Sequence, residues 1–319
     1  MKPLLGAMLG ATTVFFALPT HGQQFPSQPI TLVVPFAPGG ANDTVARVVA
    51  RSAESRLGVP IVVENKGGAG GTIGTEQVAR ARPDGYTILL VSAAHAINPL
   101  VYPNLGYDGV KDFTPVIQLT ESPYVLVVGR SVPAKSVKEL IGLARSAPGR
   151  YTYASSGTGS APHLAGALLG NMSGTELEHV PYKGGAPALI DVVRGDVTMY
   201  FSSVPSAAPH LQSGGVRALA VSTSKRVGSM PDIPTVAESG VPGYELTGWY
   251  GILAPAKTPP EVIDRLNQAF NAALADDTVK KQLAMEGSTP MGGPSSVMAT
   301  LIEKDMEKYA KMASLIKTQ

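Results

Sequence analysis

Two glycine-rich segments of the chain combine the residue types that suit a site for a small anion. The first is Phe36–Gly40 and the second is Ser155–Ser160. Glycine lets a ligand approach the main chain closely, and serine and threonine add hydroxyl donors. Each segment precedes a predicted helix, whose first amides are unpaired and whose N-terminus carries about half a positive charge. Neither segment contains Lys or Arg, so the chemistry suits a carboxylate held by amides, hydroxyls and water.

The same segments allow other interpretations. Their glycines could simply form tight turns, although two such segments in equivalent places favour binding. Ser156 or Ser160 could be a nucleophile if a base such as His163 stands nearby, which leaves a hydrolase or lyase acting on a carboxylate as the alternative function. The chain has no G-x-S-x-G motif to support that alternative. His163 could equally donate a hydrogen bond from behind the ligand or pack in the core.

Other residues near these segments also have two interpretations. Asp43 could order the first glycine segment, but a cap of its own helix is the simpler interpretation. Trp249 and Tyr250 could cover a ligand or belong to the core. The segment Tyr182–Gly185 could form a further loop at the site. Lys183 could equally well point into solvent.

Nucleotide and metal sites are poorly supported. Gly68–Gly74 resembles a dinucleotide-binding loop only loosely, because its spacing is not G-x-G-x-x-G and it follows the second predicted strand rather than the first. The histidines at 95, 163, 179 and 210 lack H-x-x-x-H or H-E-x-x-H spacing. We therefore expect no cofactor and no metal ion.

The elements around the first glycine segment predict a parallel sheet. Ile30–Phe36 is a continuous apolar, β-branched run, typical of a strand buried on both faces. Helical spacing follows over Asp43–Leu57 and ends before a glycine. Pro60–Glu64 and Thr87–Ser92 are predicted strands on either side of a helix that opens at Gly67–Thr72. In a sheet built from this βαβαβ order, ligands bind beyond the carboxyl ends of the strands.

A second series of elements begins at Tyr124–Gly129. The predicted strand Tyr151–Ser155 runs into the second glycine segment, and a helix follows over His163–Met172, so both segments occupy equivalent places. Two capping boxes, Ser136–Glu139 and Thr258–Glu261, predict helix starts. The remaining predicted elements are strands over Val197–Phe201 and Val216–Ser222, a return segment over Pro242–Pro255, and helices over Val262–Leu274 and Ser296–Leu315. The pattern predicts an α/β fold with two lobes and largely parallel sheets flanked by helices.

The composition excludes several classes of protein. The chain has 319 residues, 26 Lys and Arg against 24 Asp and Glu, and a net charge of +2. A general binder of nucleic acid would show a basic excess, so we expect no such partner. The chain has no Cys, which removes disulfides, thiolate metal sites and cysteine nucleophiles.

The N-terminus has the pattern of an export signal. Met1–Gln24 contains a basic start at Lys2, an uncharged apolar stretch over Leu4–Leu18, and a small-x-small site at Thr20–Gly22. We expect residues 1–22 to be removed, although an uncleaved amphipathic anchor is the alternative. No later stretch of about 18 apolar residues follows that could span a bilayer. The expected location is the periplasm.

Taken in order, the motifs resemble those of the tripartite tricarboxylate transporter solute receptors, also called Bug receptors. The matching segments cover nearly the whole mature chain. They are Val34–Gly40 with Asp43 and Ala46–Arg47, Val63–Gly71, Pro83–Thr87, His95–Pro99, Ser155–Leu164, Val180–Gly184 and Trp249–Gly251. Each motif alone is weak, and together they are specific.

The resemblance implies a two-lobed periplasmic-binding-protein fold with a ligand cleft between the lobes. Residues 25–121 together with 240–319 would form one lobe, and residues 122–239 the other. The implied ligand contacts come from both glycine segments and their surroundings. They are Phe36, Pro38, Gly39, Gly40, Asn42, Asp43, Ser92, Ser155, Ser156, Gly157, Thr158, Gly159, Ser160 and His163, to which we add Gly184 and Ser202.

One departure from the family bears on the ligand. Members often have an acidic residue after the strand that here ends at Tyr200–Phe201, where this chain has Ser202 and Ser203. An acid there could meet a ligand amino group, so its absence favours plain mono- or dicarboxylates, aromatic ones included.

The resemblance also implies the partners. They are a small carboxylated solute and either the membrane subunits of such a transporter or a sensor protein. We expect a monomeric receptor for uptake or sensing, with no catalytic residues.

Overall fold

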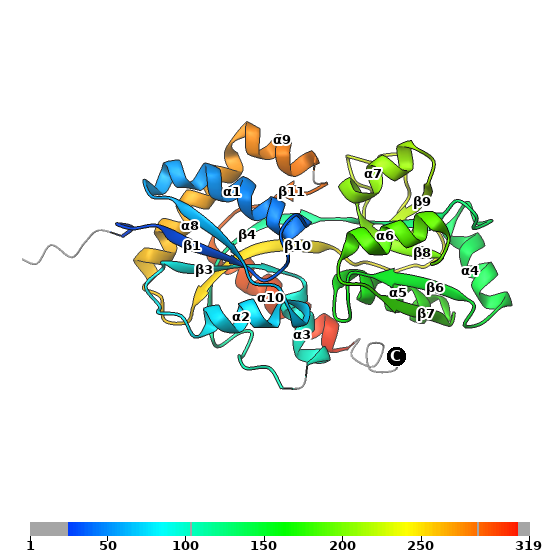
Figure 1. The fold of residues 1–319 in the computed structure, drawn as a ribbon, viewed down its shortest axis with the longest axis horizontal. Coiled ribbons are helices and arrows are strands. Elements are labelled where there is room, and N and C mark those ends of the chain that lie inside the picture. Colours follow the sequence, from blue (N-terminus) through cyan, green and yellow to red (C-terminus); the bar gives the residue numbers. More distant parts are fainter. Residues whose placement is uncertain (1–24, 103, 286, 312–319) are drawn as a thin grey trace, which may run out of the picture.

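The computed structural model describes residues 25–102, 104–285 and 287–311. The expected export signal lies outside this range, as does the end of the expected C-terminal helix. Within it, the strands form a six-stranded and a five-stranded sheet. Figure 1 shows the two sheets side by side, each with its own helices. We refer to the six-stranded sheet with its helices as lobe 1 and to the five-stranded sheet with its helices as lobe 2.

Lobe 1 has the strand order β11-β4-β10-β3-β1-β2. Its strands are β1 (Ile30–Val34), β2 (Ile61–Asn65), β3 (Thr87–Ser92), β4 (Phe113–Ser122), β10 (Gly248–Pro255) and β11 (Thr289–Pro290). Its helices are α1 (Ala41–Leu57), the short 3-10 helix η1 (Ala69–Gly71), α2 (Thr72–Ala79), α3 (Ala94–Val101), α8 (Pro260–Ala275), α9 (Asp277–Met285) and α10 (Ser295–Ala310).

Lobe 2 has the strand order β7-β6-β8-β5-β9. Its strands are β5 (Tyr124–Gly129), β6 (Tyr151–Ser155), β7 (Leu177–Pro181), β8 (Met199–Ser203) and β9 (Val216–Val221). Its helices are α4 (Val137–Ser146), α5 (Ala161–Ser173), α6 (Gly185–Arg194) and α7 (Val204–Gln212).

Both faces of each sheet are covered, which explains the continuous apolar runs in the sequence. In β1, Leu32 and Val34 pack in a cluster with residues of α1, α8 and α9, whereas Val33 belongs to a cluster with residues of α2, α3 and α10. Alternate side chains of a strand point to opposite faces. In β5, Val127 likewise packs with α6 and α7, and Leu126 belongs to the cluster that includes α4 and α5.

The chain passes between the lobes twice, and one serine ties the two crossings together. The first crossing runs from β4 into β5, and the second runs from β9 to β10. Ser222 Oγ accepts a hydrogen bond from the amide of Tyr124 at 3.1 Å and donates one to Leu246 O at 2.6 Å. Ser222 is fully buried, so this link between the crossings is shielded from water.

The expectation of a two-lobed α/β fold is confirmed, but the sheets are mixed rather than largely parallel. In lobe 1, β10 runs antiparallel to β3 and to β4. In lobe 2, β5 runs antiparallel to β8 and to β9. The reason is the double crossing: β5 and β10 each enter their sheet from the other lobe, against the direction of the local βαβ strands.

One of the two expected capping boxes is wrong. The N-cap of α8 is Pro259, and Thr258 Oγ1 donates to Pro255 O at 2.7 Å instead of accepting from the helix. At α4, Ser136 Oγ accepts from the amide of Glu139 at 3.2 Å, as expected of a cap. The carboxylate of Glu139 accepts from the amide of Lys135 rather than from Ser136.

Candidate functional site

The first glycine segment links the end of β1 to the start of α1. Gly39 has a φ of +82°, a conformation that favours glycine. Gly40 is the N-cap of α1, and no side chain caps the helix. In the described part of the chain, the amides of Ala41 and Asn42 donate to no protein acceptor. This helix N-terminus therefore keeps unpaired donors together with its partial positive charge.

Asp43 holds this loop in shape. Its Oδ2 accepts from the amide of Gly39 at 3.0 Å and its Oδ1 accepts from Asn65 Nδ2 at 3.0 Å. Asn65 Nδ2 also donates to Phe36 O at 3.1 Å, and Arg47 Nε donates to Asp43 Oδ2 at 3.0 Å. The interpretation of Asp43 as a helix cap is wrong, because its carboxylate braces the loop from the helix side.

The charge of Asp43 is maintained by these donors. Burial of the carboxyl group acts to raise its pKa, but hydrogen bonds from Arg47, Gly39 and Asn65 outweigh it and hold the pKa below its usual value. Arg47 and Asn65 were absent from the predicted site residues. Arg47 lies one helical turn after Asp43, and that spacing was the available signal.

Phe36 and Ser92 lie together at the carboxyl edge of the lobe 1 sheet. Both line a cavity of about 10 Å³, roughly the room of one water molecule, together with His95. His95 Nε2 donates to Gly109 O at 2.8 Å, which leaves Nδ1 as an acceptor, and this buried atom has no hydrogen-bond partner in the described part of the chain. The buried Oδ1 of Asn42 likewise has no hydrogen-bond partner in the described part of the chain. Such orphan acceptors suit ordered water or a ligand donor.

The second glycine segment links β6 to α5, and several of its donors are already used. The amide of Gly157 donates to Ser155 Oγ at 3.1 Å, and the amide of Gly159 donates to His163 Nδ1 at 3.2 Å. Ser160 caps α5 by accepting from the amide of His163 at 3.4 Å. Within the described residues, the amides of Ser156 and Thr158 donate to no protein acceptor. These two amides are the donors that a ligand can use.

The two lobes touch at two places. A Cβ added at Gly159 in lobe 2 would lie 3.2 Å from Val101 Cγ2 on α3 of lobe 1. A Cβ at Gly287 in lobe 1 would lie 2.8 Å from Val204 Cβ on α7 of lobe 2. The second glycine loop therefore packs against the lobe that carries the first.

The other predicted residues have mixed placements. Ser202 is buried in β8, and its Oγ donates to Ser203 O at 3.1 Å. Gly184 is the N-cap of α6 with a φ of +149°. Trp249 is a core residue, because it is 2% exposed and donates through Nε1 to Asp305 Oδ2 at 2.6 Å. No contact in the described residues places Ser202, Gly184 or Pro38 against the unpaired amides of the two loops.

The arrangement does not form the nucleophile and base of a hydrolase at Ser160. The hydroxyl of Ser160 faces the main-chain amide of His163, and the ring Nδ1 of His163 accepts from Gly159. A second serine–histidine contact joins Ser155 Oγ to His179 Nε2 at 2.7 Å. Ser155 is fully buried, so no substrate can reach that hydroxyl.

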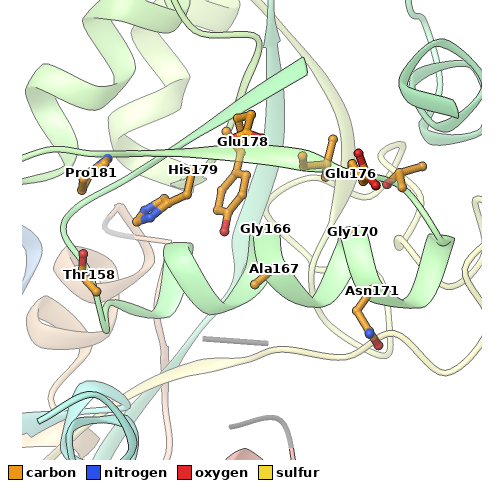
Figure 2. Close-up of a pocket in the computed structure, with 12 residues that line it drawn as sticks. Thr158, Gly166, Ala167, Gly170, Asn171, Glu176, Glu178, His179 and Pro181 are labelled. Atoms are coloured by element: carbon orange, nitrogen blue, oxygen red, sulfur yellow. The ribbon is translucent and has the colours of Figure 1, made fainter. Parts of the chain in front are cut away.

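A cavity of about 550 Å³ lies behind the second loop, between α5 and β7. Figure 2 shows Thr158, His179 and Pro181 at one end of it and Glu176 and Asn171 at the other.

Two searches of the described residues were negative. No group of three or more His, Cys, Asp or Glu residues there could hold a metal ion. In the same ranges, every helix is too short or too polar to cross a bilayer.

Comparisons with known proteins identify the family. Residues 45–318 match the family model described as the tripartite tricarboxylate transporter family receptor. This chain belongs to that family. The receptor is 41% identical over 289 residues to a protein encoded in the tcbD-tcbE intergenic region of Pseudomonas sp. strain P51, with 90% of this chain and 86% of the relative covered.

Solved structures of two relatives contain ligands. A protein from R. palustris solved with adipate is 39% identical, with a TM-score of 0.86 over 92% of this receptor and 98% of that chain. MatC from Rhodopseudomonas palustris, solved with bound malate, is 34% identical, with a TM-score of 0.83 over 92% of this receptor and 100% of that chain. The resemblance inferred from the sequence motifs is thus confirmed, and receptors of this family are periplasmic solute-binding proteins.

Proposed function

We propose that this receptor binds a small mono- or dicarboxylate between its two glycine loops. The observation that carries the proposal is the pair of loops on lobes in mutual contact, each at a helix N-terminus with unpaired amides and with no Lys or Arg in the loop. Unpaired amides and a helix dipole favour an anion. The adipate and malate held by its relatives are both dicarboxylates, which supports the same chemistry here.

The proposed binding residues are those nearest the unpaired amides. In lobe 1 they are Phe36, Gly39, Gly40, Asn42 and Ser92, and in lobe 2 they are Ser156, Gly157 and Thr158. Asp43, Ser155 and His163 support the loops from behind. Pro38 belongs to the first loop and Gly159 and Ser160 to the second. We propose these three, together with Gly184 and Ser202, as further ligand contacts. We also propose that residues 25–121 with 240–319 form one lobe and residues 122–239 the other, a division that the membership of the two sheets supports.

Contact between the lobes would remove water from the bound anion, and each amide hydrogen bond is stronger in a less polar medium. We propose that membrane subunits of a tripartite tricarboxylate transporter, or a sensor protein, then recognise the closed receptor. The export pattern in residues 1–22 supports delivery to the periplasm. The receptor itself would carry out no chemical step, and the engaged Ser160 and His163 argue against the alternative hydrolase or lyase.

A thermal-unfolding screen tests the proposal. Adipate, malate and aromatic carboxylates are compared with matched amines and sugars at fixed ionic strength. A carboxylate at 100 times its dissociation constant should add about 2.7 kcal/mol of stability. Because neutral donors hold the anion, the affinity should change little between low and high salt. Stabilisation by amines or sugars, with none by any carboxylate, would contradict the proposal, and steady turnover of a bound carboxylate would favour the alternative.

A further inference from the structure

Two histidines lie directly behind the second glycine loop and contact it at two separate points. His179 Nε2 lies 2.7 Å from Ser155 Oγ, and Ser155 Oγ accepts from the amide of Gly157. His163 Nδ1 accepts from the amide of Gly159. The two imidazole rings are stacked on each other with their centroids 4.0 Å apart. The loop is therefore connected to a single aromatic pair through the amides of Gly157 and Gly159, the second and fourth residues after the end of β6.

We propose that His163 and His179 are positioning residues that hold the second glycine loop in its ligand-binding form, and that they do so as a pair of uncharged, stacked imidazoles. This inference deepens the proposed function and rests on it. It assigns no ligand contact to either ring, because both act through the loop.

The hydrogen bonds determine which ring atoms carry protons. A main-chain amide is only a donor, so His163 Nδ1 must be unprotonated, and the neutral ring carries its proton on Nε2. Ser155 is 0% exposed, and its hydroxyl proton needs an acceptor inside the protein. His179 Nε2 lies at the right distance to be that acceptor. A relay of donors then runs from the Gly157 amide through the Ser155 hydroxyl to His179.

The surroundings of His179 favour the uncharged ring. Burial, followed by the neighbouring His163, lowers the pKa of His179 to about 3. Tyr153 of β6 stacks on His179 with centroids 5.0 Å apart and adds no charge. Glu178 lines the same cavity as His179. Its carboxylate extends toward Gly149, where an added Cβ would lie 3.7 Å from Oε1, and no hydrogen bond or ion pair joins it to His179 in the described residues.

The remaining titratable groups on the elements packed against His179 are few. Tyr151 is on β6, Glu176 precedes β7, and Tyr182 and Lys183 follow β7. Glu176 lines the far end of the cavity in Figure 2, away from His179. Tyr182 donates to Asp191 Oδ2 at 2.7 Å, so its hydroxyl is directed at α6.

This role explains why the loop presents the donors that it does. The amides of Gly157 and Gly159 are taken by side chains, and those of Ser156 and Thr158 are left without a protein acceptor in the described residues. Side chains thus hold alternate amides of the loop, and the amides between them lack a protein acceptor in the described residues. Losing either anchor would let the loop turn its free amides away from the ligand.

Matched variants separate the hydrogen bond from the ring. His179→Phe keeps an aromatic ring for stacking but loses the acceptor, whereas His179→Gln places an amide group where Nε2 lies. His163→Asn keeps an acceptor where Nδ1 lies, and His163→Leu does not. His210→Gln on α7 is the control for losing a histidine elsewhere in lobe 2.

The experiment combines three measurements on the full-length mature receptor. They are hydrogen exchange of the Gly157 and Gly159 amides without ligand, the tautomer of His163 by ¹⁵N NMR, and the dissociation constant for adipate by calorimetry. We expect His179→Phe and His163→Leu to speed exchange at their own glycine and to weaken adipate binding about tenfold, as the loss of one hydrogen bond would. We expect wild-type amide exchange rates and a wild-type dissociation constant for adipate in the three other variants, His179→Gln, His163→Asn and His210→Gln.

Two results would overturn the inference. One is an adipate affinity of His179→Phe and His163→Leu equal to that of the wild type. The other is a wild-type His163 protonated on Nδ1, which can be read without any variant if a variant fails to fold. If no carboxylate binds the wild type, the proposed function fails, while the exchange and NMR measurements still decide whether the rings hold the loop.

Discussion

The main-chain amide of Gly39 donates a hydrogen bond to the carboxylate of Asp43 at 3.0 Å. This contact folds the first glycine loop back onto the helix that it precedes. It leaves the helix without a side-chain cap, so the amides of the first turn face the candidate site unpaired. The residue that holds this loop thus differs from the residues that present its unpaired amides, and the second loop shows the same separation between His163 or His179 and its unpaired amides.

Asp43→Asn tests this bracing. The variant loses the ion pair with Arg47 and one acceptor for the Gly39 amide, so we expect the unfolding free energy to fall by about 1–3 kcal/mol and carboxylate affinity to fall about tenfold. Urea unfolding and calorimetry measure the two effects. Asp277→Asn is the control, because its ion pair with Lys280 is exposed and should be worth less than about 1 kcal/mol. Unchanged affinity in Asp43→Asn would contradict the bracing role.

Gly40→Val tests the place of the ligand in the first loop. A Cβ at Gly40 would meet only Ala37 O at 3.9 Å, so the protein has room for a side chain there. We propose that the anion occupies this room, which the valine would then fill. We expect stability within about 0.5 kcal/mol of the wild type and no measurable carboxylate binding. Gly157→Val is a less direct test, because Gly157 has a φ of +127° and an added Cβ would lie 3.3 Å from Tyr182 O. Normal binding by Gly40→Val would place the ligand elsewhere.

Acid titration tests the neutral state of His179. Its pKa is lowered to about 3 in the folded receptor, against about 6.5 in the unfolded chain. Between these values the unfolded state binds the proton and the folded state does not. The contribution of neutral His179 to the unfolding free energy is therefore complete above about pH 6.5. It decreases as the pH falls, by up to about 1.4 kcal/mol per pH unit. Chemical unfolding from pH 7 to pH 4 should show that the unfolding free energy falls less steeply with pH in His179→Gln than in the wild type. Equal slopes of unfolding free energy against pH would contradict the lowered pKa.

Asp305→Asn tests the buried contact with Trp249. Burial, partly offset by the hydrogen bond from Trp249 and the charge of Lys308, raises the pKa of Asp305. The folded state thus binds this proton more tightly than the unfolded state, so the carboxyl group contributes most at low pH and loses that contribution as the pH rises through the folded value. Asn keeps an acceptor for Trp249 without the buried charge. We expect Asp305→Asn to be at least as stable as the wild type at pH 7, and Trp249→Phe to be less stable by about 1–3 kcal/mol. A large loss of unfolding free energy at pH 7 in Asp305→Asn would contradict the view that the buried charge of Asp305 adds no stability.

Local patterns were sufficient where one segment alone determines the structure. The continuous β-branched runs predicted β1 and β3 to within two residues, and the glycine after Leu57 ends α1 in the left-handed conformation expected of Gly58. Both glycine segments lie at the end of a strand and the start of a helix, as their sequences indicated.

Such local patterns could not predict contacts between segments that are distant in the sequence. His179 meets Ser155 only because β7 pairs with β6 in parallel, with Tyr153 opposite His179. The strand LEHVP is short and carries a charged residue, so its sequence does not resemble a buried strand. The mixed direction of the sheets likewise depends on where the chain crosses between lobes, which no local period encodes.

A crystal structure of the receptor with adipate, or with the carboxylate that the screen selects, tests the central claim most directly. We predict that one carboxyl group lies within hydrogen-bond distance of main-chain amides from both loops, directly or through one water, with donors from Ala41 or Asn42 on one side and Ser156 or Thr158 on the other. A carboxyl group bound outside these loops, or held mainly by arginine, lysine or a metal ion, would contradict it.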